Sequence, residues 1–294
     1  MQHSQGTFQG ADGTELFYQE WHPAFQARAI VIGVHGHGDH SGGLRSLVDH
    51  LVPLNFCWYG FDLRGHGRSP GKRGHVAKWS DFREDLRAFL RHVMTCEPGR
   101  RVFLVGHSLG GLICLDYAGM SHIAKVLLQG ISHVSPEFAL KGRTVNEKLT
   151  RDTDVLKALD ADELRHESMS AGFWTETDAC RRWVRSHPGD LRVPLLLLYG
   201  LADRITPARA NREFFQSVSV IEKEFREYEE TRHRPFDDLN RTEVHGHLVA
   251  WLNSRLRVSD RFAPEKRMYP MNRNCTKDHY EIVHEMQVRH ACND

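Results

Sequence analysis

Apolar and polar residues follow two successive patterns along the chain. From Thr7 to His22 they alternate on both sides of a turn at Ala11-Asp12-Gly13, which predicts an antiparallel hairpin. After this segment, continuous apolar runs replace the alternation, as expected of strands that are covered on both faces. The predicted strands are Arg28–Val34, Cys57–Asp62, Arg101–Gly106, Ala124–Gly130, Pro194–Gly200 and Glu222–Glu229.

Stretches with helical periodicity separate these apolar runs. In the first of them, large apolar side chains recur at three- and four-residue spacing, at Phe82, Leu86, Leu90 and Val93. The predicted helices are Trp79–Cys96, Leu109–Met120, Pro207–Val218 and Leu239–Leu256. Strands that alternate with helices predict βαβ units, and hence an α/β fold with a mostly parallel, doubly wound sheet.

One interval interrupts the alternation of strands and helices. Residues 132–191 contain helix-like segments without a strand run, and the sheet pattern resumes at Pro194. We therefore predict that this interval is inserted between two strands and forms a helical lid above the strand ends. Its large apolar residues are Phe138, Leu156, Leu159, Met169, Phe173, Trp174 and Trp183. The predicted domains are a core of residues 1–131 and 192–258, the lid of residues 132–191, and a polar C-terminal extension of residues 259–294.

Composition restricts the partners that the chain is expected to have. Its 39 basic and 38 acidic residues give a net charge of +1, so no overall field recruits nucleic acid or anionic lipid. No stretch approaches the roughly 20 apolar residues of a membrane helix, so no integral membrane segment is expected. The first ten residues also lack the basic start and apolar core of a signal peptide. Six scattered cysteines without a CxxC pair are typical of reduced thiols, and we predict a cytoplasmic protein with a small-molecule partner.

A G-x-S-x-G run, Gly106-His107-Ser108-Leu109-Gly110, lies between a predicted strand and a predicted helix. A serine hydroxyl is a poor nucleophile until a base takes its proton and a sharp turn presents its oxygen. Glycines allow the helix to pass close to the strand at such a turn. The strand, turn and helix together predict that Ser108 is the nucleophile of a serine hydrolase.

An acid and a histidine are expected to follow the serine along the chain. Asp203 comes three residues after the strand that ends at Gly200, at the edge of the sheet where ligands gather. Its carboxylate would orient the imidazole of the base. Three histidines compete for that role, namely His233, His245 and His247. The last two fall inside a predicted helix, whereas His233 follows a strand on a loop and is therefore favoured.

Acyl transfer also needs two backbone N–H groups directed at the negative charge that develops on the carbonyl oxygen. Leu109, which directly follows the nucleophile, supplies one of them. The loop after the first core strand supplies the other, from His37, because the glycines that flank His37 permit an unusual backbone path. This chemistry requires neither a metal nor another cofactor, and none is expected.

Five segments of the chain together resemble the monoacylglycerol lipase/lysophospholipase branch of the α/β hydrolases, which is often grouped with serine aminopeptidase-like sequences. They are VHGHGDHSGG (34–43), FDLRGHGRSPGKRGH (61–75), VGHSLGG (105–111), LYGLADRITP (198–207) and HRPFDDLNR (233–241). The resemblance extends from about residue 7 to residue 256. It implies an α/β-hydrolase fold and a serine esterase or lipase activity. It also implies a triad of Ser108, Asp203 and His233, and an oxyanion hole formed by His37 and Leu109. His37 departs from the small residue that is common at its position, and the chain after residue 259 has no counterpart.

Two alternative functions remain open at this point. The run from His35 to His40 has the pattern H-x-H-x-D-H, which resembles the dinuclear zinc signature of metallo-β-lactamase-type hydrolases. That interpretation leaves the serine turn, Asp203 and the loop of His233 unexplained. A hydrolase-fold binding protein would keep the triad without turning over a substrate.

The lid provides candidates for substrate binding. Phe173 and Trp174 are adjacent large apolar residues in the predicted insertion. We predict that they line a slot for an acyl chain above Ser108. In that case the preferred substrates would be monoacylglycerol- or lysophospholipid-like esters.

Overall fold

The computed structural model describes residues 1–120, 127–132 and 146–260. Its strands are β1 (Gln2–Gln9), β2 (Glu15–His22), β3 (Ala29–Val34), β4 (Phe56–Phe61), β5 (Val102–Ser108), β6 (Leu127–Ser132), β7 (Leu195–Gly200) and β8 (Lys223–Tyr228). Its α-helices are α1 (Arg45–Leu51), α2 (Trp79–Cys96), α3 (Leu109–Met120), α4 (Thr153–Ala161), α5 (Ala171–Ser186), α6 (Ala208–Ser217) and α7 (Arg241–Asp260). The predicted C-terminal extension lies outside the described residues from 261 onward.

The strands form one sheet in the order β1-β2-β4-β3-β5-β6-β7-β8. β1 and β2 make the predicted antiparallel hairpin, and β2 also runs antiparallel to β4. All other neighbouring strands are parallel. Every residue of β3, β4 and β7 is buried, which agrees with their continuous apolar sequences. The predicted α/β fold with an N-terminal hairpin is confirmed.

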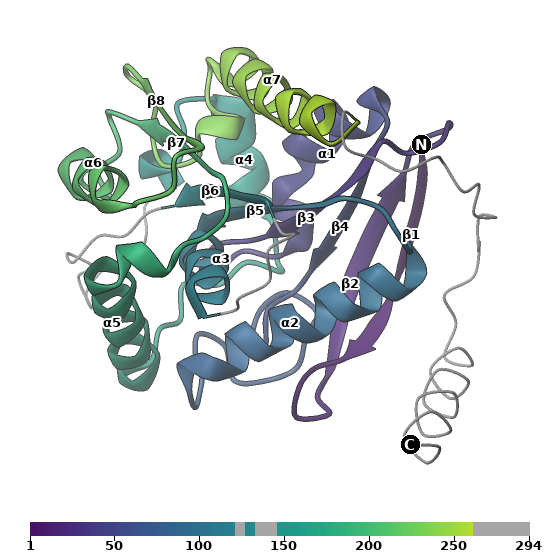
Figure 1. The fold of residues 1–294 in the computed structure, drawn as a ribbon. Coiled ribbons are helices and arrows are strands. Elements are labelled where there is room, and N and C mark those ends of the chain that lie inside the picture. Colours follow the sequence, from purple (N-terminus) through teal and green to yellow (C-terminus); the bar gives the residue numbers. More distant parts are fainter. Residues whose placement is uncertain (121–126, 133–145, 261–294) are drawn as a thin grey trace, which may run out of the picture.

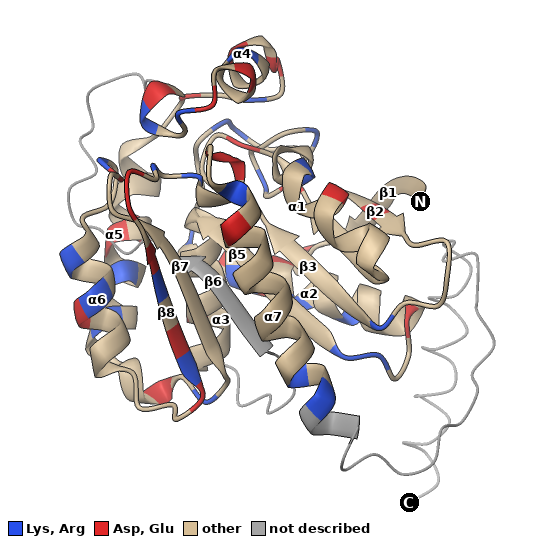
Figure 2. Ribbon diagram, turned by 90° about the horizontal axis from the view of Figure 1, so that it is seen from above, with Lys and Arg blue, Asp and Glu red and all other residues tan. Residues whose placement is uncertain are grey.

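Helices cover both faces of this sheet (Figure 1). Residues of α2, α3, α5 and α6 pack into one apolar core, which includes Phe82 and Phe214. Residues of α1 and α7 pack into the other core on the opposite face, which includes Leu47 and Leu248. In contrast to these buried layers, the edge strand β8 carries both acidic and basic residues (Figure 2).

The insertion connects two strands that are hydrogen-bonded neighbours, β6 and β7. Its helix α5 buries Phe173, Cys180 and Val184 in the core that α2 and α3 share. Its helix α4 supplies Leu159 and Asp160 to a cavity at the carboxyl edge of the sheet. Phe138, which was assigned to the lid, lies outside the described residues. The boundaries of the lid domain stay a prediction.

Two expectations from composition meet different outcomes. No helix within the described part of the chain is long and apolar enough to cross a membrane. Cys57, Cys114 and Cys180 are buried free thiols. Cys96, however, is disulfide-bonded, so the prediction of reduced thiols is wrong for this cysteine. No cysteine spacing motif around Cys96 reveals this bond in the sequence.

Candidate active site

Ser108 lies at a sharp turn between a strand and a helix. It is the last residue of β5, and α3 begins at the next residue. Its φ of 53° falls in the left-handed region, which residues other than glycine rarely adopt. The start of α3 can approach β3 this closely because residue 110 is a glycine. A Cβ at this position would clash with the carbonyl oxygen of Val34, at only 2.1 Å. The local geometry therefore exposes the serine at the carboxyl end of β5.

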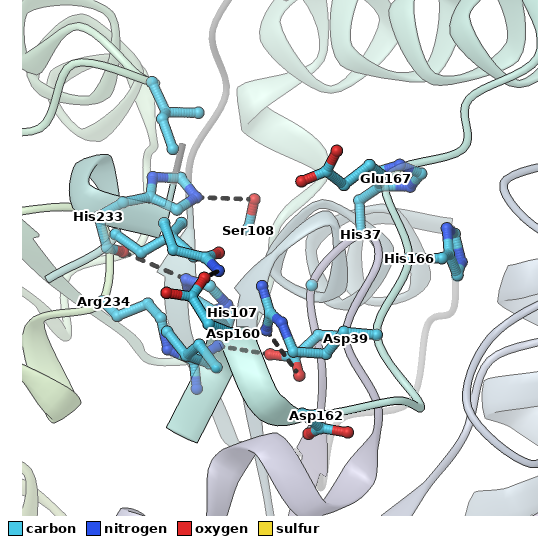
Figure 3. Close-up of a pocket in the computed structure, with 16 residues that line it drawn as sticks. His37, Asp39, His107, Ser108, Asp160, Asp162, His166, Glu167, His233 and Arg234 are labelled. Carbon is cyan, nitrogen blue, oxygen red and sulfur yellow. Dashed lines mark hydrogen bonds and ion pairs between the residues drawn. The ribbon is translucent and has the colours of Figure 1, made fainter. Parts of the chain in front are cut away.

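The three residues predicted as a triad come together from three different strand ends. The Nε2 of His233 lies 3.1 Å from the Oγ of Ser108, as the dashed line in Figure 3 marks. The Nδ1 of His233 lies 2.9 Å from the Oδ2 of Asp203. Asp203 and His233 are both buried, on the loops that follow β7 and β8. With a proton on Nδ1, the imidazole donates to Asp203 and accepts the proton of the serine hydroxyl.

The carboxylate of Asp203 is held by partners on its own loop. Its Oδ1 accepts hydrogen bonds from the backbone N–H groups of Ile205 and Thr206, at 2.7 and 3.0 Å. Its Oδ2 accepts the hydroxyl of Thr206 at 2.7 Å as well as the imidazole of His233. Thr206 was not among the residues predicted for the site. The available signal is the spacing, because an aspartate side chain in a loop often accepts hydrogen bonds from residues two or three positions later. Thr206 is three residues after Asp203.

His107, the residue before Ser108, supports the loop of His233. The Nε2 of His107 lies 3.2 Å from the backbone oxygen of His233, and the two rings are 5.1 Å apart. The insertion contacts the same loop, because the backbone N–H of Arg234 donates to the oxygen of Leu149 at 2.7 Å. His233 is therefore fixed from two sides by segments distant in sequence.

A buried ion pair joins the loop of His233 to the loop after β3. The guanidinium of Arg234 contacts Asp39 at 2.5 Å and Asp237 at 2.7 Å. Arg165 of the insertion reaches the same Asp39 at 3.2 Å. Burial opposes ionisation of Asp39, but the two guanidinium groups outweigh it and hold the pKa of this carboxyl below its usual range. Three segments that border the site are thus tied together by charge.

The loop of His37 runs directly beside Ser108. A Cβ at Gly36 would lie 3.2 Å from the Cβ of Ser108, and Gly38 has a φ of +69°. His37 and Leu109 both line a cavity that also contains Ser108. The side chain of His37 packs against the ring of Phe173, 4.8 Å away. Burial lowers the pKa of His37 to about 3, so its ring is neutral at physiological pH.

The chain is similar in sequence to known ester hydrolases. A family model described as serine aminopeptidase, S33, matches residues 26–124 and 116–240. The chain belongs to this family. A monoacylglycerol lipase of Mycolicibacterium smegmatis is 24% identical, over 86% of the chain and 98% of the relative. A monoglyceride lipase of Rattus norvegicus is 28% identical, over 85% of the chain and 90% of the relative.

Solved structures agree with this assignment. The crystal structure of Paleococcus ferrophilus monoacylglycerol lipase matches with a TM-score of 0.71 and 29% identity, over 82% of the chain and 99% of that structure. The family and these relatives show that the chain is an α/β-hydrolase and a carboxylic ester hydrolase. The alternative of a binding protein without turnover is therefore not favoured.

Two cavities of this hydrolase meet at Ser108. The larger, of about 350 Å³, is lined by many polar residues, among them Asp160, His166 and Glu167, and also by Leu149 and Leu159 (Figure 3). The narrower, of about 60 Å³, is lined mainly by apolar groups, among them Leu109, Leu112, Met169, Phe173, Trp174 and Ile205. Phe173 and Trp174 thus line the same cavity as Ser108, and their role in holding an acyl chain stays a prediction. Phe173 also belongs to the core, because its ring contacts that of Phe82 at 6.1 Å.

The side chains of the H-x-H-x-D-H run have partners other than a shared metal position in the described part of the chain. The Nε2 of His35 accepts the backbone N–H of Leu63 at 3.0 Å, and the Nε2 of His40 lies 2.7 Å from Asp162. Asp39 is engaged by two arginines. Within the described residues, no three metal-ligating atoms of this run converge. The pattern is part of the loop that runs beside Ser108, and the zinc alternative is not favoured.

The histidines that competed with His233 have structural partners on α7. The Nε2 of His245 lies 3.0 Å from the backbone oxygen of Phe236. The Nδ1 of His247 lies 2.9 Å from the hydroxyl of Tyr228. Each contact ties α7 to a neighbouring segment of the chain.

Proposed function

We propose that this hydrolase cleaves monoacylglycerol- or lysophospholipid-like esters with Ser108 as nucleophile, His233 as base and Asp203 as the acid that orients it. The observation that carries the proposal is the continuous hydrogen-bond chain from Ser108 through His233 to Asp203, at 3.1 and 2.9 Å. It has the order and the atoms that activation of a serine hydroxyl requires. The relatives named as monoacylglycerol and monoglyceride lipases support the choice of ester.

The reaction has two halves. The Nε2 of His233 takes the proton of Ser108 while the Oγ attacks the acyl carbon, and the backbone N–H groups of His37 and Leu109 stabilise the oxyanion. The imidazolium then gives its proton to the leaving alcohol, and an acyl-enzyme remains. In the second half, His233 deprotonates a water molecule that attacks the acyl-enzyme and releases the acid. Asp203 stays ionised throughout and stabilises the imidazolium.

The two cavities at Ser108 suit an ester with dissimilar halves. The apolar cavity, bordered by Phe173 and Trp174, would receive the acyl chain, and each buried methylene would add roughly 0.8 kcal/mol of binding. The polar cavity, bordered by His166 and Glu167, would receive a hydroxylated or phosphorylated alcohol. An amphiphilic substrate with a single acyl chain uses both cavities at once.

The nucleophile is tested by covalent labelling and substitution. A fluorophosphonate should modify Ser108 stoichiometrically, as located by peptide mass spectrometry. Ser108→Ala should lose about 10⁶-fold in kcat if the triad acts as a unit. An unmodified serine, or near-normal turnover by the variant, would refute the assignment. A chelator should leave ester hydrolysis unchanged, and loss of activity on metal removal would revive the zinc alternative.

A further inference from the structure

A second group of reactive side chains lies at the edge of the sheet opposite to Ser108. His22 ends β2, Cys57 is the second residue of β4, and Glu97 directly follows α2. Trp21 pairs with Trp58 across the two strands, and this register brings His22 beside Cys57. β4 and β5 run in the same direction, and Cys57 lies near the amino end of β4 whereas Ser108 lies at the carboxyl end of β5. The group is therefore at the other edge of the sheet and plays no part in the proposed ester hydrolysis.

The three side chains direct their ligating atoms at a common point. The Nδ1 of His22 lies 3.3 Å from the Sγ of Cys57 and 3.7 Å from the Oε1 of Glu97. All three atoms lie within 4.8 Å of one another. In a tetrahedral zinc site, bond lengths of about 2.3 Å to sulfur and 2.0–2.2 Å to nitrogen and oxygen place the ligand atoms roughly 3.5 Å apart. A zinc ion therefore fits between them with only small side-chain movements.

The surroundings of these atoms have the form that supports metal ligands. The other ring nitrogen of His22, Nε2, lies 3.5 Å from a carboxylate oxygen of Glu20 and 3.3 Å from the hydroxyl of Tyr59. Ligating histidines commonly donate their second N–H to such a carboxylate. Arg100 binds the Oε2 of Glu97 at 2.7 Å. The other oxygen of Glu97, Oε1, accepts the hydroxyl of Tyr59 at 3.4 Å and lies on the side of the sulfur and the imidazole.

We propose that His22, Cys57 and Glu97 bind one Zn²⁺ ion that fastens β2 and β4 to the end of α2. A thiolate, an imidazole and a carboxylate are zinc ligands, whereas calcium and magnesium take oxygen alone. Cys57 is a free, buried thiol, and the side chain of His22 is 28% exposed, which gives the ion a path from solvent. A water molecule completes the tetrahedron.

Metal titration of the full chain tests this proposal. Zinc competed against a chromophoric chelator should bind with one equivalent that depends on Cys57. Cobalt in its place should give the intense near-ultraviolet absorption of a thiolate ligand. Cys57→Ser, His22→Gln and Glu97→Gln should each weaken binding by more than about 100-fold, and Glu20→Gln by about 10- to 100-fold. Cys180→Ala, which removes another buried thiol, is the matched control and should bind zinc as the unmodified chain does.

Two outcomes would overturn the zinc site. One is a cobalt spectrum without thiolate absorption, and the other is unchanged zinc affinity in the Cys57→Ser and Glu97→Gln variants. If Cys57→Ser does not fold, protection of Cys57 in the unmodified chain replaces it. Zinc should slow alkylation of Cys57, measured by peptide mass spectrometry, and an unchanged rate would count against the proposal. Ester hydrolysis should be the same with and without zinc, so this test and that of Ser108 can fail independently.

Discussion

Asp203 accepts four hydrogen bonds, two from backbone N–H groups and two from the side chains of Thr206 and His233. This number matters because a carboxylate with free rotation would spend time away from the imidazole. The contacts fix both oxygens, and the loop that carries them is therefore part of the proposed machinery. Positioning of this kind is what allows a single imidazole to act as base and then as acid.

Substitution of the three candidate histidines tests which of them is the base. His233→Ala should reduce kcat/KM for a short ester by about 10⁴-fold or more, because Ser108 then has no proton acceptor. His245→Ala and His247→Ala serve as matched controls and should keep most of the activity, since their rings bind Phe236 and Tyr228. Circular dichroism should show that all three variants fold. Full activity in His233→Ala, with inactivity in either control, would contradict the assignment.

The residues of the candidate triad could be named from sequence, and the partners that support them could not. Ser108, Asp203 and His233 each follow a recognisable strand pattern, and parallel strands bring such positions to one edge. The contact between His107 and His233 spans 126 residues, and that between Asp39 and Arg234 spans 195. No local periodicity encodes which of many distant charges will meet, so these contacts required the three-dimensional structure.

At the scale of elements, the length of a helix decides whether its periodicity can be recognised in the sequence. The bounds predicted for α2 and α3 are those observed, because both helices are long or directly follow a strand. The seven-residue helix α1 was missed, since two turns are too short for a helical period to stand out. β5 continues two residues beyond its predicted end, through His107 to Ser108, where the apolar run has already stopped.

The insertion should determine acyl-chain preference. Trp174→Ala and Phe173→Leu should shift the preferred acyl length, because both side chains line the apolar cavity at Ser108. Hydrolysis of short esters should change little, since the triad is untouched. Phe173→Leu is preferred to alanine, which would cost about 3–5 kcal/mol of stability at so buried a site.

Kinetics on esters of graded acyl length provide the measurement. Trp183→Ala is the control from the same helix, because Trp183 stacks on His187 and does not line the cavity. Equal factors of change for long and short esters would mean that the insertion is scaffolding. The proposal of a lipid-like substrate would then rest on the relatives alone.

At the scale of the whole molecule, neutral histidines make the fold sensitive to acid. Burial lowers the pKa of His37 to about 3 and the pKa of His66 well below its usual value, and the pKa of His166 is lowered as well. Their rings pack against one another, with His66 and His166 4.7 Å apart. The folded state thus disfavours protonation, whereas the unfolded chain accepts protons near pH 6.5. Stability contributed by neutral rings is present above that pH and is lost below it.

The free energy of unfolding should therefore decline as the pH falls below about 6.5. Each strongly shifted histidine contributes about 1.4 kcal/mol per pH unit, and His37 continues to do so toward about pH 3. Urea unfolding at pH 7.5, 6.5 and 5.5 measures the slope. His66→Leu should flatten it, and the same substitution at exposed His187 should not. A slope that is equal in all three proteins would show that the buried cluster is not its cause.

The insertion leaves the sheet after β6 and returns at β7, the next strand in the sheet. Because β6 and β7 are parallel, the insertion begins at the carboxyl edge of the sheet, beside Ser108, and has to return to the amino edge where β7 begins. The sequence of α5 is constrained because this helix forms part of the core, whereas α4 contributes no residue to that core. The residues of the insertion that line the cavities can thus change during evolution, as long as Leu149 and Arg165 keep their contacts with Arg234 and Asp39. Related enzymes can therefore acquire new substrate specificities while they keep the same reaction.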